Sequence, residues 1–196
     1  MAMSFVGSSE TAVVLGNPSH LDFNSRGNNF TLMGWVKVTP GNTGTIIAKR
    51  DFFGGQYHFA VETGGYLGCY MGNNQSVGAT EIDDGEWHHL AAANYLSAST
   101  YYFDIYVNGV KDESTALSGV QDGFGDDVVI GAYRTTVGVE GYSWVLTGDL
   151  ADVRAYNRAL LVDEIATIYT CRGNDNIVYG LAGRWPLNEK PPGTAA

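Results

Sequence analysis

The chain alternates short runs of apolar, β-branched and aromatic residues with turns of glycine, asparagine, aspartate and serine, at a spacing of about ten residues. Within the run 101–107, Tyr101, Phe103, Ile105 and Val107 share one face by period two, and we expect that face in the core. The pattern predicts an all-β fold, an antiparallel two-sheet sandwich. Its strands are expected at 12–15, 30–38, 44–49, 57–62, 66–71, 86–95, 101–107, 110–114, 127–131 and 148–156.

The dipeptide Asn108-Gly109 directly follows one of these runs and marks a reversal of the chain. Asparagine followed by glycine supplies the two positive-φ positions that a type I′ turn requires. We therefore expect a tight hairpin, in which the strand that begins at Val110 folds straight back on 101–107.

One stretch near the C-terminal end has helical instead of strand periodicity. Ile165, Ile168 and Tyr169 are spaced at helical intervals, acidic residues occupy the first turn, and Gly173 follows the end. Acidic side chains at a helix N-terminus complement its dipole. The sequence predicts one short helix near 161–171, packed at an edge of the sandwich.

Length and composition indicate one domain, 1–196. The chain has 196 residues, of which 44% are apolar, and this suffices for one sizeable core. Eleven basic against twenty-one acidic residues give a formal charge of -10, without a clustered Lys/Arg stripe. Such a charge repels phosphate backbones, so nucleic acid is not expected as a partner.

The chain shows no sign of membrane insertion or export. No run approaches the roughly 18 to 20 apolar residues of a membrane span, and residues 1–4 lack the start of a signal peptide. The two cysteines, Cys69 and Cys171, have no metal-binding spacing. We expect them to be isolated buried thiols, with a disulfide between them as the alternative.

Four segments carry recognisable motifs in a fixed order. They are 30–37 (FTLMGWVK), 86–91 (EWHHLA), 105–109 (IYVNG) and 146–170, which runs from a strand through an Asn-Arg-Ala-Leu corner into the predicted helix. Together they resemble the LamG-like jelly-roll domains of the concanavalin A-like lectin/glucanase superfamily. The resemblance implies a jelly-roll sandwich and a ligand that is a glycan or a protein.

The segment 180–196 is apolar enough at its start to be buried. It is similar to the Gly-Leu-Val-x-x-Trp run that usually opens a domain of this family, ahead of a Phe-x-Gly segment like 5–7. Two explanations follow. Either 181–187 supplies the opening strand of the sandwich from a permuted position, or it begins a second repeat that is truncated here.

A glucanase reading rests on Glu81, Asp83 and Glu86, whose spacing matches the Glu-x-Asp-x-x-Glu motif of glucanases on this sandwich. Retaining glycosidases need two carboxylates about 5 to 5.5 Å apart on a rigid support. Asp84-Gly85 interrupts the motif with a strong turn signal, so we expect a solvated acidic turn.

No other motif supports catalysis or zinc. His88 and His89 are neighbours in a predicted strand and point to opposite faces, so they cannot easily share an ion, and one is expected inside and one outside. No Gly-x-Ser-x-Gly elbow and no phosphate loop occurs in the chain. We therefore expect no enzymatic activity.

The resemblance implies a structural calcium ion at the rim of the jelly roll, held by loop carbonyls and carboxylates. It points to Asn17, in the loop 16–20, and to Asp152 in the closing strand. Many relatives have a further aspartate where this chain has Ala151. The alternative for Asp152 is an ion pair with Arg154 or with a neighbouring strand.

Ligand binding is expected from aromatic and amide residues in glycine-rich loops, because a sugar stacks on rings and its hydroxyls bond to amides and charged groups. The candidates are Phe53, Asn74, Gln75, Arg134, Tyr142 and Trp144. Loops gather at the ends of a sandwich, so several could share one rim. Trp35 and Trp87 stand within strands and are expected in the core, as is Trp185 if its segment is a strand.

These features favour a non-enzymatic recognition module that binds carbohydrate through rim loops. The alternative is a structural or adhesive module of a larger surface or virion protein, with protein partners and possible self-association; a glucanase is a remote third reading. The family resemblance favours an extracellular surface or a virion, although the chain itself carries no signal peptide. Function is thus inferred largely from fold analogy.

Overall fold

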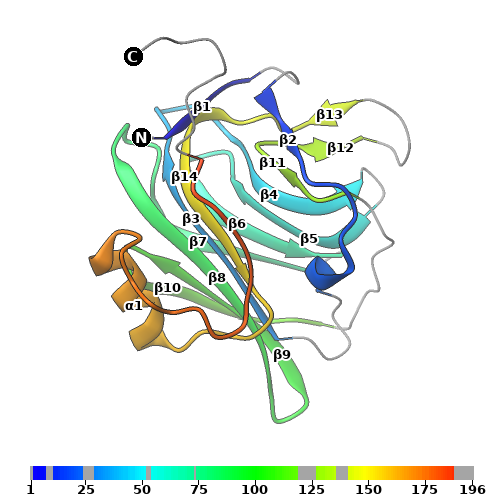
Figure 1. Ribbon diagram of the computed structural model, residues 1–196, viewed down its shortest axis with the longest axis vertical. Coiled ribbons are helices and arrows are strands. Elements are labelled where there is room, and N and C mark those ends of the chain that lie inside the picture. Colours follow the sequence, from blue (N-terminus) through cyan, green and yellow to red (C-terminus); the bar gives the residue numbers. More distant parts are fainter. Residues whose placement is uncertain are drawn as a thin grey trace.

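A computed structural model describes residues 2–7, 11–23, 29–51, 54–72, 74–118, 127–135 and 141–187. Two antiparallel sheets, of seven and six strands, pack face to face, and a two-stranded ribbon lies beside the smaller sheet. Figure 1 shows helix α1 on one side of the sandwich and the ribbon, β12 and β13, at the opposite upper corner. The predicted all-β sandwich with a short helix is confirmed.

The larger sheet has the order β1-β14-β3-β8-β9-β10, with β15 also paired to β14, and the smaller sheet has the order β2-β11-β4-β5-β6-β7. The strands of the larger sheet are β1 (Met3–Val6), β3 (Phe30–Lys37), β8 (Trp87–Ser97), β9 (Thr100–Val107), β10 (Val110–Ala116), β14 (Thr147–Tyr156) and β15 (Leu181–Trp185). Those of the smaller sheet are β2 (Val13–Val14), β4 (Gly44–Asp51), β5 (Gly54–Val61), β6 (Tyr66–Met71), β7 (Asn74–Glu81) and β11 (Val129–Ile130). The remaining elements are β12 (Tyr133–Arg134), β13 (Tyr142–Ser143), helix α1 (Val162–Cys171) and a 3-10 turn at Ser19–Leu21.

The core lies between the two sheets and is built from alternate residues of each strand. Phe103, Ile105 and Val107 of β9 are buried in it, and Tyr101 packs against it, which confirms the face predicted from period two. The hairpin prediction is also confirmed, because Asn108 and Gly109 have positive φ and join β9 directly to β10.

The predicted helix is present as α1, but it covers part of the outer face of the larger sheet, whereas the sequence analysis placed it at an edge of the sandwich. Ile165 and Ile168 pack on outward-facing residues of β3, β8, β9 and β14. These strands bury both faces, which explains why β3 and β8 are apolar at most positions. The helix also rests on the β9–β10 turn, where a Cβ on Gly109 would stand 3.2 Å from the Ala166 Cα.

Two edge strands, β1 and β7, are not predicted by the sequence pattern. Strand β7 begins at Asn74 and Gln75, two residues that the sequence analysis assigned to a glycine-rich loop. Its sequence, NQSVGATE, is polar, and only Ser76 is fully buried. An edge strand that gains its stability from backbone pairing with β6 leaves little apolar alternation to read. All ten strands that the sequence pattern predicts are present, with ends that differ by three residues or fewer.

Both ends of the described chain pair with the same edge of β14. Strand β1 follows the first half of β14 and places Met3 opposite Leu150, and β15 follows the second half and places Trp185 opposite Val153. Trp185 packs against the core. The segment 181–185 is thus an edge strand of this sandwich, and its origin, as a permuted opening strand or as the start of a second repeat, stays a prediction.

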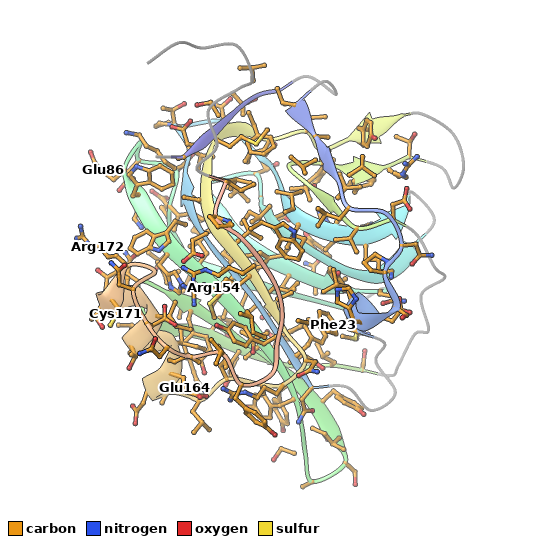
Figure 2. All side chains as sticks on the ribbon, in the orientation of Figure 1. Phe23, Glu86, Arg154, Glu164, Cys171 and Arg172 are labelled. Carbon is orange, nitrogen blue, oxygen red and sulfur yellow. The ribbon has the colours of Figure 1, made fainter. Side chains whose placement is uncertain are left out.

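A buried ion-pair network centred on Arg154, which is labelled in Figure 2, fastens the segment between α1 and β15 to β14. The Arg154 side chain is 1% exposed and donates to Asp175 at 2.8 and 3.0 Å and to Asp152 at 2.6 Å. The Tyr156 hydroxyl donates to the carbonyl of Ile177 at 2.9 Å. Burial alone would raise the pKa of both carboxyls, but the hydrogen bonds from the guanidinium lower it, so both stay charged.

Candidate functional site

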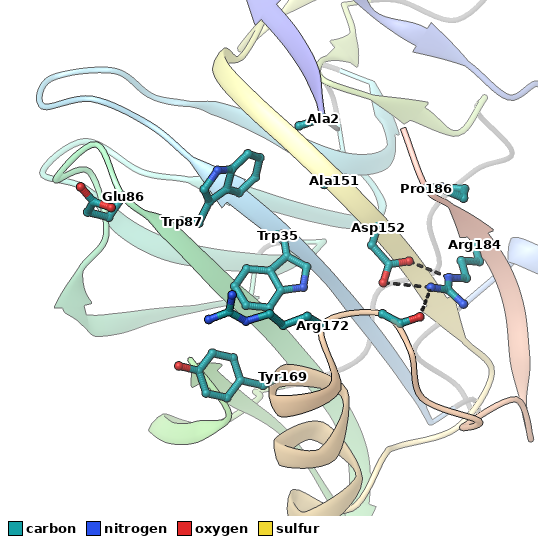
Figure 3. Close-up of a pocket in the computed structure, with 11 residues that line it drawn as sticks. Ala2, Trp35, Glu86, Trp87, Ala151, Asp152, Tyr169, Arg172, Arg184 and Pro186 are labelled. Carbon is teal, nitrogen blue, oxygen red and sulfur yellow. Dashed lines mark hydrogen bonds and ion pairs between the residues drawn. The ribbon is translucent and has the colours of Figure 1, made fainter. Parts of the chain in front are cut away.

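A pocket of about 720 Å³ opens on the outer face of the larger sheet, beside the C-terminal end of α1 (Figure 3). Three aromatic side chains line it: Trp35 from β3, Trp87 from the start of β8, and Tyr169 from α1. Its volume falls within the roughly 300 to 1,000 Å³ of small-molecule sites. The wall of the pocket is rigid, because the larger sheet packs on the core with one face and on helix α1 with the other.

The register of the sheet sets the position of the rings. Trp35 lies opposite His89 of β8 on one side and opposite Ala151 of β14 on the other. The ring centroids of Trp35 and Tyr169 are 5.7 Å apart in a stacked arrangement, and those of Trp35 and His89 are 5.3 Å apart. Trp87 stands two residues before His89, on the same face, with 36% of its surface exposed. The small Ala151 adds little bulk beside Trp35, and the pocket opens there.

An ion pair between Asp152 and Arg184 stands at one side of the pocket. Strand β14 carries a bulge between Ala151 and Arg154, and Asp152 within it has a φ of 49°. Arg184 donates to Asp152 at 2.6 Å and to the carbonyl of Gly173 at 2.8 Å. A Cβ on Gly173 would stand 3.0 Å from the Asp152 carboxylate. The pair therefore fixes the end of α1 against β14 and β15.

Two further charged side chains at the pocket are not engaged in this way. Arg172 follows α1 with a φ of 47° and exposes its side chain, and Glu86 lies exposed in the turn before β8. Within the described residues, neither side chain has a hydrogen-bond or ion-pair partner. In Figure 3, the Arg172 side chain extends toward Trp35 and Tyr169, and Glu86 lies farther out, past Trp87.

His89 contributes a neutral ring to this region. Burial, together with the charge of Arg154, lowers the pKa of His89 to about 4. Its backbone N–H donates to the Asn108 side chain at 3.0 Å, and its Nδ1 is buried without a partner in the described part of the chain. At neutral pH the imidazole therefore adds flat surface beside Trp35 and no charge.

Three of the sequence-predicted ligand residues come together at the ribbon, away from this pocket. Arg134 of β12 is the register partner of Tyr142 of β13, and its guanidinium lies 5.8 Å from that ring and pairs with Asp127 at 2.6 Å. Trp144 follows β13, and its ring centroid lies 5.5 Å from that of the buried His58. The structure thus gives these side chains packing partners, and a role for them in binding stays a prediction.

The other three predicted ligand residues differ in their surroundings. Asn74 and Gln75 begin β7, at the edge of the smaller sheet. The Asn74 side chain accepts a hydrogen bond from the backbone N–H of Ser118 at 2.9 Å, so it ties the end of β10 to β7. Gln75 is exposed, and Phe53 lies outside the described residues.

The two residues predicted for calcium do not form a common donor set. Asn17 is exposed beside the smaller sheet, whereas Asp152 belongs to the larger sheet and both its carboxylate oxygens accept from Arg154 or Arg184. Among the described residues, no group of three or more His, Cys, Asp and Glu is placed to hold a metal ion. The ion-pair alternative for Asp152 is what the structure shows, and a calcium ion at the rim stays a prediction.

The acidic stretch 81–86 forms a turn, as predicted. Strand β7 ends at Glu81, and Asp84 accepts from the backbone N–H of Glu86 at 2.9 Å and from His88 at 3.0 Å. Gly85 has a φ of 83°, which suits a turn. Because these carboxylates stand in a turn and not on one strand face, the spacing does not reproduce the glucanase arrangement.

The prediction that Trp35 and Trp87 lie in the core is wrong, and these rings are the residues that sequence reasoning missed. Both lie on the outer face, where Trp35 is half-buried and Trp87 is exposed. Strand β3 is apolar on both faces, so apolarity alone does not distinguish them. Alternation does, because Leu32 and Val36 point into the core and Trp35 is out of phase with them.

The two cysteines are free thiols. Cys69 is buried in the smaller sheet, as predicted, and burial raises the pKa of its thiol. Cys171 is only half-buried at the end of α1, which corrects the expectation of a buried side chain. Neither thiol lines the pocket.

A sequence profile of the Concanavalin A-like lectin/glucanases superfamily matches residues 7–166. The chain belongs to this superfamily. A search of curated proteins finds no match. Within the part of the chain that the structure describes, no helix is long and apolar enough to cross a membrane.

Several solved structures share this superfamily fold. The heptameric SAP-like pentraxin from Limulus polyphemus has a TM-score of 0.63 and 21% identity, over 88% of this chain and 82% of its own. A putative carbohydrate binding protein from Bacteroides ovatus has a TM-score of 0.69 and 20% identity, over 95% of this chain and 51% of its own. The binding domain of botulinum neurotoxin serotype G has a TM-score of 0.67 and 14% identity, over 86% of this chain and 42% of its own. This chain thus spans about half or less of the last two proteins, and these likenesses show the fold alone.

Proposed function

We propose that the protein is a non-enzymatic carbohydrate-recognition module and that the pocket on the outer face of the larger sheet is its binding site. The observation that carries the proposal is the set of rings Trp35, Trp87 and Tyr169 around one solvent-open pocket. Sugar rings have apolar faces that stack on aromatic side chains. The rings come from packed strands and a packed helix, so little ordering is needed on binding.

The charged groups at the pocket support recognition instead of hydrolysis. Asp152 is held deprotonated by hydrogen bonds from Arg154 and Arg184, so it lacks the proton that a general acid must give. Glu86 lies exposed in a turn. A glycosidase needs a protonated and an ionised carboxyl held across one bond, and these two residues do not supply that pair.

The experiment is a glycan array of the purified chain, followed by affinity measurements on single-ring variants. We expect a defined sugar class to bind, and Trp87→Ala to weaken it about tenfold or more, because a stacked ring contributes of the order of 1 kcal/mol and its loss also uncovers apolar surface. Trp144→Ala is the matched control, since Trp144 is a comparably exposed ring at the ribbon.

The paired variants also decide between two places on the molecule. If Trp144→Ala abolishes binding and Trp87→Ala does not, the site is the ribbon with Arg134 and Tyr142. If the array is blank with calcium and with chelator, the carbohydrate proposal fails. Both variants are first compared by thermal melting, because Trp144 packs on the buried His58.

A second candidate function, an adhesive or assembly module with protein partners, is favoured by a different observation. Leu161 and Val162 at the start of α1, and Val178 and Tyr179 before β15, are large apolar side chains that are 49% to 80% exposed. Exposed apolar residues of this size suit a protein contact. Sedimentation of the purified chain tests for self-association, and a monomer at all concentrations would remove a second copy as the partner.

A further inference from the structure

We propose that the pocket selects a saccharide bearing an isolated carboxylate, such as a uronic acid, and that Arg172 pairs with this carboxylate. The inference rests on the proposed function and specifies its ligand class. It starts from the charges of the pocket, because these are the groups that distinguish one sugar from another once the rings have bound its apolar face.

Of the two arginines that line the pocket, one is not paired with another described residue. Arg184 is paired with Asp152 and bonded to the Gly173 carbonyl, so its charge is compensated. Arg172 lines the same pocket and, among the described residues, has no hydrogen-bond or ion-pair partner. A guanidinium presents two parallel N–H groups that match a carboxylate, and such pairs are among the stronger hydrogen bonds.

The backbone around Arg172 is fixed, although its side chain is exposed. Arg172 is the left-handed residue that ends α1, with a φ of 47° and ψ of 47°. Gly173, next in the chain, is pressed against Asp152 and Arg184 so closely that a Cβ would stand 3.0 and 3.2 Å from their side chains. The backbone of Arg172 is therefore held beside the pocket, and its side chain extends from there toward Trp35 and Tyr169 (Figure 3).

Glu86 makes the pocket asymmetric in charge, because it places a carboxylate in the same pocket as the Arg172 guanidinium. It lines the same pocket, and no described residue neutralises its carboxylate. A carboxylate on the ligand is repelled by Glu86 and attracted by Arg172, while sugar hydroxyls can donate to Glu86. A uronic acid that stacks near Trp87 satisfies both groups at once, whereas a neutral sugar offers Arg172 only hydroxyl oxygens as acceptors and no opposite charge.

The net negative charge of the chain favours a glycan with few, widely spaced carboxylates over a densely charged one. A formal charge of -10 repels an extended polyanion before it reaches the surface. One local cation can compensate one carboxylate, and it cannot compensate a row of sulfates. We therefore expect weak or no binding of polysulfated glycans at physiological salt.

The test compares oligosaccharides that contain glucuronic or galacturonic acid with their methyl esters, which have the same rings and hydroxyls without the charge. We expect the unmodified protein to bind at least one acid about tenfold or more tightly than its ester. Arg172→Gln should bind acid and ester within about twofold of each other. Arg172→Lys, which keeps the charge without the fork of donors, should retain part of the preference.

Trp87→Ala separates this inference from the proposed function. It should weaken acid and ester by a similar factor, because it removes stacking and not charge. If acid and ester bind the unmodified protein equally, if Arg172→Gln keeps the preference, or if a polysulfated glycan binds best, the assignment of Arg172 is overturned while carbohydrate recognition stands. If Trp87→Ala changes nothing, the proposed site itself fails. Unchanged melting temperatures confirm that the variants are folded.

Discussion

At the scale of single residues, Arg154 shows how a charge is accommodated inside this fold. Its side chain is almost fully buried, and its main partner is Asp175, whose side chain is 1% exposed. We predict that Arg154→Met lowers the free energy of unfolding by about 3 to 5 kcal/mol, because Asp175 then keeps a buried charge without a cation and with only the backbone N–H of Ile177 as a donor. Urea denaturation of the variant measures this loss.

Arg184→Met is the control for that prediction. It removes a guanidinium from the same network, but the Arg184 side chain is 35% exposed and Asp152 keeps Arg154. Its cost should stay below about 1 kcal/mol, the range of exposed ion pairs. Equal losses for the two variants would contradict the account of Arg154 as the buried centre of the network.

Two buried histidines predict that the protein loses stability in mild acid. Burial is the main cause that lowers the pKa of His58 to about 3 and of His89 to about 4, against 6.5 in an unfolded chain. Between pH 6.5 and 4 the unfolded chain binds these protons and the folded protein does not, so stability present above pH 6.5 falls with pH. Each histidine should contribute a loss of about 2 kcal/mol between pH 7 and pH 5.

Denaturation curves at pH 7 and pH 5 measure this effect. His89→Gln should show about half of the pH dependence of the unmodified protein, because His58 remains. Asp152 and Asp175 do not confuse the result, since carboxyls with lowered pKa values destabilise the fold only at lower pH. A protein equally stable at both pH values would contradict the prediction.

At the scale of elements, β15 is expected to be part of the folding unit. Removal of residues 180–196 uncovers the second half of β14, where β15 pairs opposite Val153 to Tyr156, and exposes apolar surface next to Trp185. We predict a lower melting temperature, by several degrees or more, since a loss of 1 kcal/mol shifts a domain of this size by about 2 to 4 °C. Thermal melting monitored by circular dichroism checks this.

Truncation after Leu187 is the matched control, because it keeps β15. An unchanged melting temperature on removal of 180–196 would show that β15 is dispensable, and would also argue against the permuted opening strand. A loss confined to the longer deletion supports β15 as an integral strand.

The elements differ in how far the sequence alone predicts them. The β9–β10 hairpin could be predicted closely, because Asn108-Gly109 has few other conformations and period two places Phe103 and Ile105 inward. Strand β7 could not, because its sequence is polar and its stability comes from pairing with β6. The alternation of apolar and polar residues reflects which side chains are buried, and an exposed edge strand buries few of them.

The candidate site was harder to predict than the fold for a related reason. Tyr169 and Trp35 lie 134 positions apart in the sequence and meet only because α1 packs on β3. Alternation within β3 could have placed Trp35 on the outer face, but no local pattern reports what covers that face. The free charge of Arg172 depends on which neighbouring acids are already paired, and this is a property of the folded molecule.

At the scale of the whole molecule, the two candidate binding regions lie on different parts of the sandwich. The pocket belongs to the larger sheet and α1, and the ribbon belongs to the side of the smaller sheet (Figure 1). The two regions share no residue, so a variant in one leaves the side chains of the other in place. Comparison of Trp87→Ala with Trp144→Ala is informative for this reason.

The shared edge of β14 has a consequence for how this module can be carried. Met3 and Trp185 face strand residues three positions apart, about 10 Å along β14, so the chain enters and leaves the domain at almost one point. Polypeptide segments joined to the two ends of the domain would therefore be separated only by the width of a short loop. Such a module can be inserted into a loop of a host protein as a side branch, without moving apart the two host segments that it joins.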